Sequence, residues 1–271
     1  RLEAFVGAHP RAPRHTPDAL LRLAELYTER AFEDYDAGRV ERPDLGPTIG
    51  AARRIVREFE GYARRDRAAS LLGWALAESG REAEAVEVFR SMVCANRHRY
   101  PASAAPPEPT AAHPALTPET PPRAPRYEGC VAARRTGPDD LEGEVWLRLG
   151  ELHFDLARLD DAIGAYRRVV ALPSHRLFAF GLYKLAWSHY RAGHYAEAIE
   201  RFAQLVDWSD EVERTTGRAG SDLREEALQY IAVTLAWDDW DEDGQPEHAA
   251  GGAPPLERLE DPSLWPHDRA W

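Results

Sequence analysis

The stretch WLRLGELH, residues 146–153, decides the fold, because a related stretch, LYKLAWSH, follows at residues 182–189. The same relation holds between DAIGAY at residues 161–166 and EAIERF at residues 197–202. Both pairs are offset by about 36 residues, and self-similarity at such a period is typical of a solenoid built from two-helix units. The sequence therefore predicts an array of helical hairpins.

Small and aromatic residues recur at fixed places in this pattern. Gly150 and Ala162 fall where the two helices of one hairpin cross closely, and a large side chain there would push the helices apart. Tyr166 and Phe202 fall where space between hairpins must be filled. The pattern thus specifies packing positions as well as helices.

These residues resemble the signature of the tetratricopeptide repeat (TPR) family, W-x2-L-G-x2-Y followed by A-x3-F and a later proline. His153 replaces the usual tyrosine. The residues that match are Trp146, Leu149, Gly150, Ala162, Tyr166 and Pro173. The resemblance implies an all-α, right-handed superhelical solenoid that binds proteins and needs no cofactor.

Weaker copies extend the array on both sides. LGWAL at residues 72–76, with Ala85 and Phe89, forms a third hairpin, and residues 20–27 open an earlier one. A last first helix covers residues 228–235. We expect about four hairpins, interrupted by a proline-rich insert and followed by an irregular tail. The expected segments are N-terminal hairpins at 1–94, the insert or strap at 95–140, C-terminal hairpins at 141–240, and an acidic loop and tail at 241–271.

In such an array the first helix of each hairpin lines the concave groove, where partners bind. We take as groove candidates the residues on the side of each first helix opposite its small-residue position. They are Trp74, Glu78, Leu147, Glu151, Phe154, Asp155, Tyr183, Trp187, Tyr190, Arg191, Gln229 and Trp237. Aromatic residues are common anchors of protein contacts, which favours a binding surface. Alternatively, neighbouring hairpins, the insert or the tail bury these rings.

The charged candidates are mostly acidic, and Glu25 and Glu29 in the first hairpin add to them. An aromatic, acidic groove should prefer apolar or basic segments. The sequence therefore predicts a non-catalytic scaffold that binds a protein or peptide. The alternatives are a structural subunit whose groove is filled by its own insert and tail, or a calcium-stabilised binding module.

The two cysteines, Cys94 and Cys130, flank the proline-rich insert. A disulfide between them would close a loop of about 37 residues and contribute roughly 3–4 kcal/mol. It would also indicate an oxidising compartment such as a periplasm. The alternative is a buried thiol at Cys94 and an unrelated loop thiol at Cys130.

Two sets of residues raise the question of metal binding. Asp239, Asp241 and Asp243, followed by Gly244, match the first half of a calcium loop, and Glu247 falls at its ninth position. The twelfth position is an alanine rather than the usual glutamate, so an acidic helix end is the alternative. His153 and His189 share one slot in adjacent hairpins, about 10 Å apart, which is too far to ligate one metal directly.

Charge and motifs exclude other functions. The net charge of −12 argues against a nucleic-acid surface. The longest strongly apolar run, residues 177–183, is too short to span a bilayer. Motifs of serine hydrolases, P-loop nucleotidases and zinc proteases are absent from the sequence, so we expect no enzyme. The chain begins at Arg1 without a methionine, which suggests a processed or trimmed piece and leaves export open.

The cysteine pair, the prolines and the acidic charge are similar in style to bacterial envelope members of the family. Those members resemble accessory proteins of outer-membrane assembly and of motility complexes. We therefore expect a periplasmic or envelope location within a multiprotein complex, with the cytoplasm as the alternative. The sequence leaves the oligomeric state and the partner's identity open.

Overall fold

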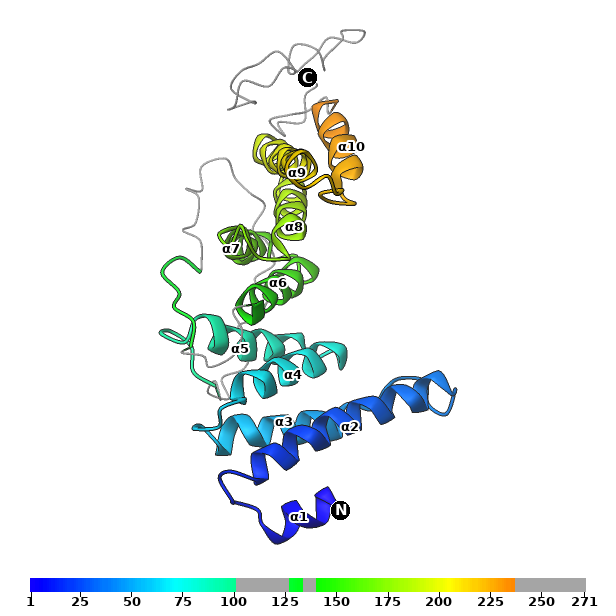
Figure 1. Cartoon of the computed structure of the whole chain (residues 1–271), viewed down its shortest axis with the longest axis vertical. Coiled ribbons are helices and arrows are strands. Elements are labelled where there is room, and N and C mark those ends of the chain that lie inside the picture. Colours follow the sequence, from blue (N-terminus) through cyan, green and yellow to red (C-terminus); the bar gives the residue numbers. More distant parts are fainter. Residues whose placement is uncertain (101–126, 134–139, 237–271) are drawn as a thin grey trace. The chain divides into compact units, whose positions relative to one another are not determined.

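The computed structural model describes residues 1–100, 127–133 and 140–236, and all regular structure in these ranges is helical (Figure 1). Trp237, the predicted calcium ligands and most of the insert lie outside them. The helices are α1 (Leu2–Ala8), α2 (Thr16–Asp36), α3 (Gly46–Glu58), α4 (Arg65–Glu78), α5 (Glu82–Val93), α6 (Asp140–Asp155), α7 (Leu159–Val170), α8 (Phe178–Arg191), α9 (Tyr195–Thr216) and α10 (Arg224–Leu235). The predicted all-α class of helical hairpins is confirmed.

The chain divides into two compact units. Unit 1 comprises residues 1–122 and 127–152, and unit 2 comprises residues 123–126 and 153–271. Each unit has its own buried apolar residues, which a packed helical domain requires. The two units are described separately below.

Unit 1 contains two hairpins, α2–α3 and α4–α5, with α1 packed on α2. Helix α3 begins with Pro47 in its first turn, where the missing N–H costs no helical hydrogen bond. Ala24 and Ala52 are completely buried, so small residues occupy the interior of the first hairpin. In the second hairpin, a Cβ atom on Gly73 would lie 2.5 Å from Cε1 of Phe89. This contact joins the glycine and the aromatic residue of the predicted repeat.

Substituting Gly73 tests this packing directly. We expect Gly73→Ala to lower the free energy of unfolding by about 1–3 kcal/mol, because the added methyl group would overlap the Phe89 ring. The matched control is Gly50→Ala, in α3, where a Cβ atom would meet nothing within 4 Å. Alanine favours helix, so this control should raise stability by up to about 1 kcal/mol. Urea unfolding of both variants checks the opposite signs, and equal effects would contradict the account.

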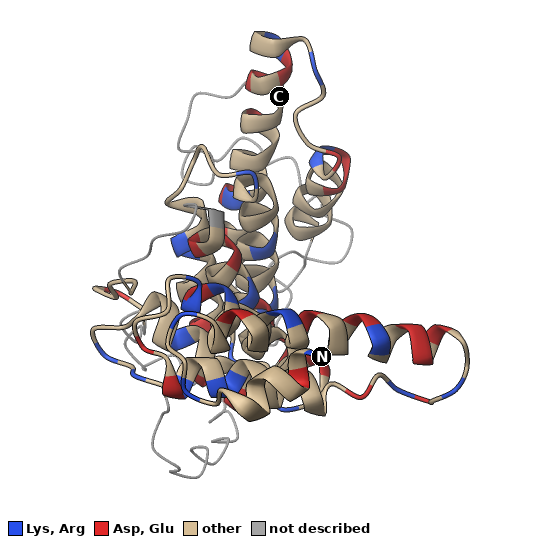
Figure 2. Cartoon of the chain, turned by 60° about the horizontal axis from the view of Figure 1, so that its bottom comes forward, with Lys and Arg blue, Asp and Glu red and all other residues tan. Residues whose placement is uncertain are grey.

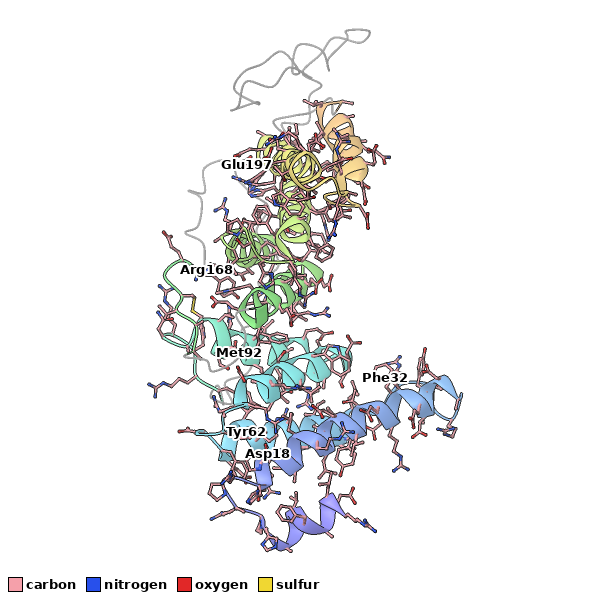
Figure 3. All side chains as sticks on the ribbon, in the orientation of Figure 1. Asp18, Phe32, Tyr62, Met92, Arg168 and Glu197 are labelled. Carbon is pink, nitrogen blue, oxygen red and sulfur yellow. A yellow bond between two sulfur atoms is a disulfide. The ribbon has the colours of Figure 1, made fainter. Side chains whose placement is uncertain are left out.

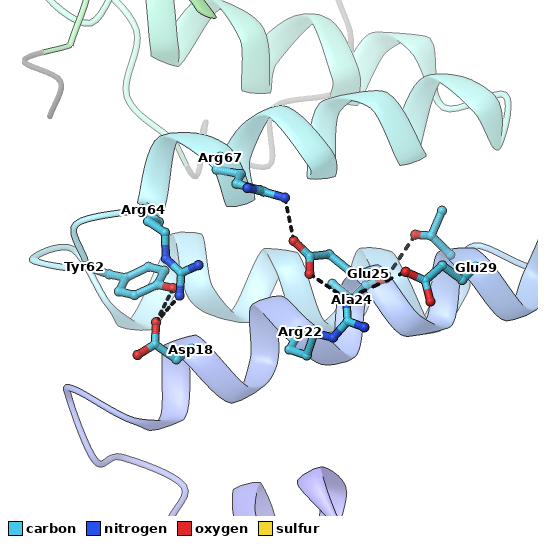
Figure 4. Close-up of polar contacts among 9 residues, drawn as sticks. Asp18, Arg22, Ala24, Glu25, Glu29, Tyr62, Arg64 and Arg67 are labelled. Carbon is cyan, nitrogen blue, oxygen red and sulfur yellow. Dashed lines mark hydrogen bonds and ion pairs between the residues drawn. The ribbon is translucent and has the colours of Figure 1, made fainter. Parts of the chain in front are cut away.

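The start of α2 is tied to the turn between α3 and α4 by a polar network (Figure 4). The Tyr62 hydroxyl donates to Asp18 Oδ1 at 2.7 Å, and the Arg64 guanidinium donates to the same oxygen. These two hydrogen bonds lower the pKa of Asp18, while burial and the bond to Asp18 raise the pKa of Tyr62 to about 12. The network is exposed, so it orients the turn more than it stabilises the fold.

Unit 2 is built around the α8–α9 hairpin, with α7 on one side and α10 on the other. Its core includes Leu182, Ala186, Ala198 and Phe202, all completely buried. A Cβ atom on Gly181 would lie 2.7 Å from Cγ1 of Val169, so only glycine allows α7 and α8 to approach this closely. The core thus repeats the arrangement of small and aromatic residues that the sequence predicts.

Helix α9 is long, at 22 residues, and ends at Gly217 in the left-handed conformation (φ +67°). The chain then turns back so closely that a Cβ atom on Gly220 would overlap the backbone of Ser209. The backbone N–H of Ser221 donates to Ser209 Oγ at 3.0 Å. These contacts fix the direction in which α10 leaves α9.

Candidate partner-binding surface

Three predicted groove aromatics, Tyr183, Trp187 and Tyr190, lie along one side of α8 at positions i, i+4 and i+7. Helical spacing places such residues one above the other on the same face. Trp187 contacts both tyrosines, with ring centroids 6.4 Å from Tyr183 and 5.5 Å from Tyr190. The three rings therefore lie together along one face of α8, while their place in a partner-binding groove stays a prediction.

Tyr230 of α10 completes the cluster, whereas the repeat pattern predicted its neighbour Gln229 at this place. Its ring centroid is 4.4 Å from that of Trp187, in an edge-on arrangement that aromatic pairs prefer. Tyr230 also stacks on the buried Phe202 of α9. We call Tyr183, Trp187, Tyr190 and Tyr230 the aromatic cluster. Its four rings come from the first helices of two successive hairpins.

The rings of the aromatic cluster are half-buried. One side packs on the core around Phe202, while part of each ring remains accessible. The expectation that neighbouring helices bury these rings is thus true of the side that faces the core. The accessible remainder consists of amphipathic tryptophan and tyrosine rings that contact one another.

A hydrogen bond to the carboxylate of Glu226 fixes the position of Tyr183 at the edge of the aromatic cluster. The Tyr183 hydroxyl donates to Glu226 Oε1 at 2.6 Å, which links α8 to the first turn of α10. Burial first, and then the hydrogen bond to Glu226, raise the pKa of Tyr183 to about 12. The hydroxyl therefore stays protonated at physiological pH and keeps donating to Glu226.

Phe154 and Arg191 also meet in unit 2. The Arg191 guanidinium carbon lies 4.7 Å from the Phe154 ring centroid, a cation–π contact. Asp155 and Gln229 are exposed, and Asp155 has no ion pair with any described residue. In this part of the predicted site, the Asp155 carboxylate is therefore accessible, whereas one face of the Phe154 ring is covered by Arg191.

The candidates in unit 1 differ in accessibility. Trp74 is half-buried against Phe32 of α2, with ring centroids 6.1 Å apart, whereas Glu78 is exposed. Leu147 is only 7% exposed. Glu151 pairs with Arg148 at 3.0 Å. Among the groove candidates of this unit, only Trp74 and Glu78 thus offer accessible side chains with no ion pair to a described residue.

Arginines neutralise several of the acidic candidates. Glu25 lies 2.8 Å from Arg67 and 3.2 Å from Arg22, which also approaches Glu29 (Figure 4). Acidic and basic residues also alternate along the helix ribbons in Figure 2. The surface is less acidic than the sequence alone suggests, and Glu78 and Asp155 keep their charges unpaired within the described ranges. The i,i+3 spacing of Arg22 to Glu25 and of Arg148 to Glu151 could have predicted these two ion pairs from the sequence. The pair between Arg67 and Glu25 could not be predicted in this way, because the two residues are far apart in sequence.

Cys94 and Cys130 form a disulfide, with their sulfurs 1.97 Å apart. Of the predicted insert, residues 127–133 lie against the end of α5 (Figure 3). From here on, the word strap refers to these seven residues alone. Its backbone exchanges two hydrogen bonds with that end, from the Ala95 N–H to the Val131 carbonyl and from the Ala133 N–H to the Met92 carbonyl. The disulfide alternative of the sequence analysis is the one that the structure contains.

Tyr127 anchors the strap, a role that the sequence analysis missed. Its side chain is 2% exposed, and its ring meets the edge of the buried Trp146 at 5.3 Å between centroids. The half-buried Arg90 donates to the Tyr127 hydroxyl at 3.1 Å and lies over its ring. The strap is therefore part of the core of unit 1, at least in its described residues.

His153 and His189 are both buried in unit 2. Neither ring nitrogen of His189 has a hydrogen-bond partner. Among the described residues, no group of three or more histidines, cysteines and carboxylates is placed to hold a metal. The predicted calcium ligands Asp239, Asp241, Asp243 and Glu247 lie outside the described residues, so calcium binding stays a prediction.

No helix within residues 1–100, 127–133 and 140–236 combines the length and the apolar character that a membrane span requires.

Comparison with known proteins agrees with the repeat pattern. Residues 125–176 match one family model described as tetratricopeptide repeat, and residues 181–207 match another with the same description. No curated protein matches the chain. The chain therefore contains tetratricopeptide repeats in these two segments, and such repeats generally mediate protein–protein interactions without catalysis or a cofactor.

Among solved structures, the chain is similar to nearly identical TPR-like repeats of a protein described as a putative kinesin light chain from Podosopora anserina. That match has 16% identity and a TM-score of 0.48, and covers 90% of this chain and 94% of the other. A second structure, of a point variant of the same repeats, matches with 16% identity and a TM-score of 0.48, covering 80% of this chain and 86% of the other.

Proposed function

We propose that the chain is a protein-binding scaffold and that the aromatic cluster of unit 2 is its principal contact surface. The observation that carries this proposal is the position of Trp187, in contact with Tyr183, Tyr190 and Tyr230. Rigid tryptophan and tyrosine rings lose little conformational entropy on binding and dominate the energetics of many interfaces.

The charge near the cluster favours a particular kind of partner. The carboxylate of Glu226 lies at the edge of the cluster, and Asp155 is a further exposed carboxylate of unit 2 with no ion pair to a described residue. Apolar side chains would cover the rings, and a basic side chain would find a carboxylate or a ring face nearby. We therefore assign the surface to an apolar or basic segment of a protein partner.

A peptide library provides a defined probe. A phage-displayed library selected on the full chain should yield apolar and basic peptides. We expect Trp187→Ala combined with Tyr190→Ala to weaken the binding of a selected peptide at least 100-fold, because buried aromatic anchors each contribute about 2 kcal/mol or more. Titration calorimetry measures the change, and circular dichroism verifies that the variant is folded.

The matched control is Tyr35→Ala, because Tyr35 is an exposed aromatic residue on α2 of unit 1. It should leave peptide binding unchanged. A less disruptive variant, Asp155→Arg, should weaken basic peptides selectively and leave apolar ones unaffected. Unchanged binding by the double variant would overturn the assignment of the surface.

We also propose that the protein works in an oxidising compartment, as part of an envelope complex. The disulfide supports this, because such bonds persist outside the reducing cytosol. A free-thiol count on protein isolated from its native source without reductant tests the proposal. Two reactive thiols would contradict it and would favour the cytoplasm.

A further inference from the structure

One side of unit 1 gathers arginine side chains that have no carboxylate partner among the described residues. The turn between α1 and α2, the turn between α3 and α4, and the segment that follows α5 all lie on this side (Figure 1). The Arg54 guanidinium donates to the Pro10 carbonyl at 2.6 Å, which ties the first of these turns to the end of α3. We call this side the basic edge. Its exposed arginines without an ion pair to a described residue are Arg11, Arg14, Arg57, Arg97 and Arg99.

Other contacts hold two of these guanidinium groups in place. Arg57 lies over the Tyr100 ring, 5.7 Å from its centroid, and the Tyr100 hydroxyl accepts a hydrogen bond from Arg53. Arg97 packs on the strap, because a Cβ atom on Gly129 would lie 3.0 Å from Arg97 Nη2. Both groups are therefore positioned by packing while their side chains remain exposed, so ordering them around a bound carboxylate costs little entropy.

Arg57 differs in one respect from other arginines of unit 1 that lie over tyrosine rings. Two such arginines also bind a carboxylate. Arg64 pairs with Asp18, and Arg90 pairs with Glu87 at 3.1 Å. Arg57 has its ring but no carboxylate partner within the described residues. A planar guanidinium binds a carboxylate through two parallel hydrogen bonds, so a carboxylate is the group that would complete this arrangement.

The carboxylates on this side do not balance the basic edge. Asp18, Glu58 and Glu87 already pair with other arginines. The edge is therefore locally positive, although the net charge of the chain is −12. The charge of the whole chain would repel a long polyanion such as nucleic acid, whereas a short acidic segment can lie within the edge, where screening limits the repulsion. The remaining exposed carboxylates of the described residues on this side are Glu60, Asp66 and Glu128.

We propose that the basic edge docks an acidic segment of a partner protein, separately from the aromatic cluster of unit 2. Aspartate or glutamate side chains of that segment pair with Arg57 and Arg97, and the remaining arginines of the edge attract it and set its position. The edge consists of turns and helix ends, and the groove candidates are not part of it.

The probe is a fluorescently labelled peptide of about ten glutamates, roughly 33 Å long when extended. We expect it to bind the full chain at low salt in an anisotropy titration, and its affinity to fall as salt screens the charges. Arg57→Gln combined with Arg97→Gln should weaken binding by about 10-fold or more. The matched control, Arg42→Gln combined with Arg218→Gln, removes the same charge at exposed positions away from the edge and should leave binding nearly unchanged.

A reciprocal variant separates charge from folding. Glu60→Gln combined with Glu128→Gln removes like charges from the edge and should tighten binding by about 3-fold, which a loss of structure could not do. Circular dichroism verifies that each variant is folded. Trp187→Ala combined with Tyr190→Ala should leave oligoglutamate binding unchanged. Failure of this proposal can therefore be told apart from failure of the proposed function.

Other outcomes overturn the proposal. Failure of the peptide to bind at low salt, or equal binding by the double variant of Arg57 and Arg97, means that the edge is not a docking surface. Tighter binding of a short DNA duplex than of oligoglutamate means that the ligand is a nucleic acid. Oligoglutamate binding that appears only when Glu108 and Glu119 are replaced by glutamine means that the chain's own insert fills the edge.

Discussion

Replacing Cys94 and Cys130 with alanine is expected to lower the free energy of unfolding by about 3–4 kcal/mol. The disulfide joins residues 36 apart in sequence, so its loss restores the freedom of a long loop in the unfolded chain. In the folded chain it holds the strap, and with it Tyr127, against α5 and Trp146. Urea unfolding, followed by tryptophan fluorescence, measures the loss.

Reductant provides the control for the disulfide. Dithiothreitol should lower the stability of the wild type towards that of the double alanine variant and leave the variant unchanged. Because Tyr127 packs on Trp146 and Arg90, the strap retains some contacts after reduction. Wild-type stability that is insensitive to reductant would show that the strap is held by these contacts alone.

Lowering the pH from 7 to 5 is expected to destabilise unit 2 through His189. Burial, followed by the nearby positive charges of Arg167, His194 and Arg201, lowers the pKa of His189 to about 3. The unfolded chain binds a proton below about pH 6.5, whereas the folded chain does not. The stability that neutral His189 provides is therefore complete above about pH 6.5 and is lost progressively as the pH falls towards 3. The slope approaches 1.4 kcal/mol per pH unit, or roughly 2 kcal/mol between pH 6.5 and 5.

His189→Leu isolates this contribution, because the chain itself places Leu76 and Leu235 in the same slot of α4 and α10. Between pH 7 and 5 the variant should lose about 2 kcal/mol less stability than the wild type. The control His15→Gln, at an exposed position, should keep the wild-type pH dependence. Identical pH profiles for the wild type and His189→Leu would show that His189 gains a proton in the folded state.

The repeat core could be predicted from the sequence because its determinants are local and periodic. The spacing of Gly73 to Phe89 and of Ala186 to Phe202 specifies which small residue meets which aromatic ring, and the structure contains the first contact and buries the second pair. The same spacing placed Tyr183, Trp187 and Tyr190 on one face. The fold class needed no information from distant parts of the chain.

The remaining features depend on contacts between distant residues. Arg67 neutralises Glu25 from a different helix, so the acidic character of unit 1 was overestimated. Tyr230 joins the aromatic cluster because its long side chain reaches Trp187 from the position beside Gln229. Tyr127 follows a segment outside the repeats, and no periodicity indicates that it is buried. These contacts depend on side-chain reach and on the path of the strap.

Hydrogen–deuterium exchange on the full chain, with and without a library-selected peptide, tests the central claim most directly. The account predicts slower exchange in α8 and α10, around Trp187 and Tyr230, and no change in α2. Protection that is confined to unit 1, or absent despite saturating peptide, would contradict the assignment of the aromatic cluster as the partner-binding surface.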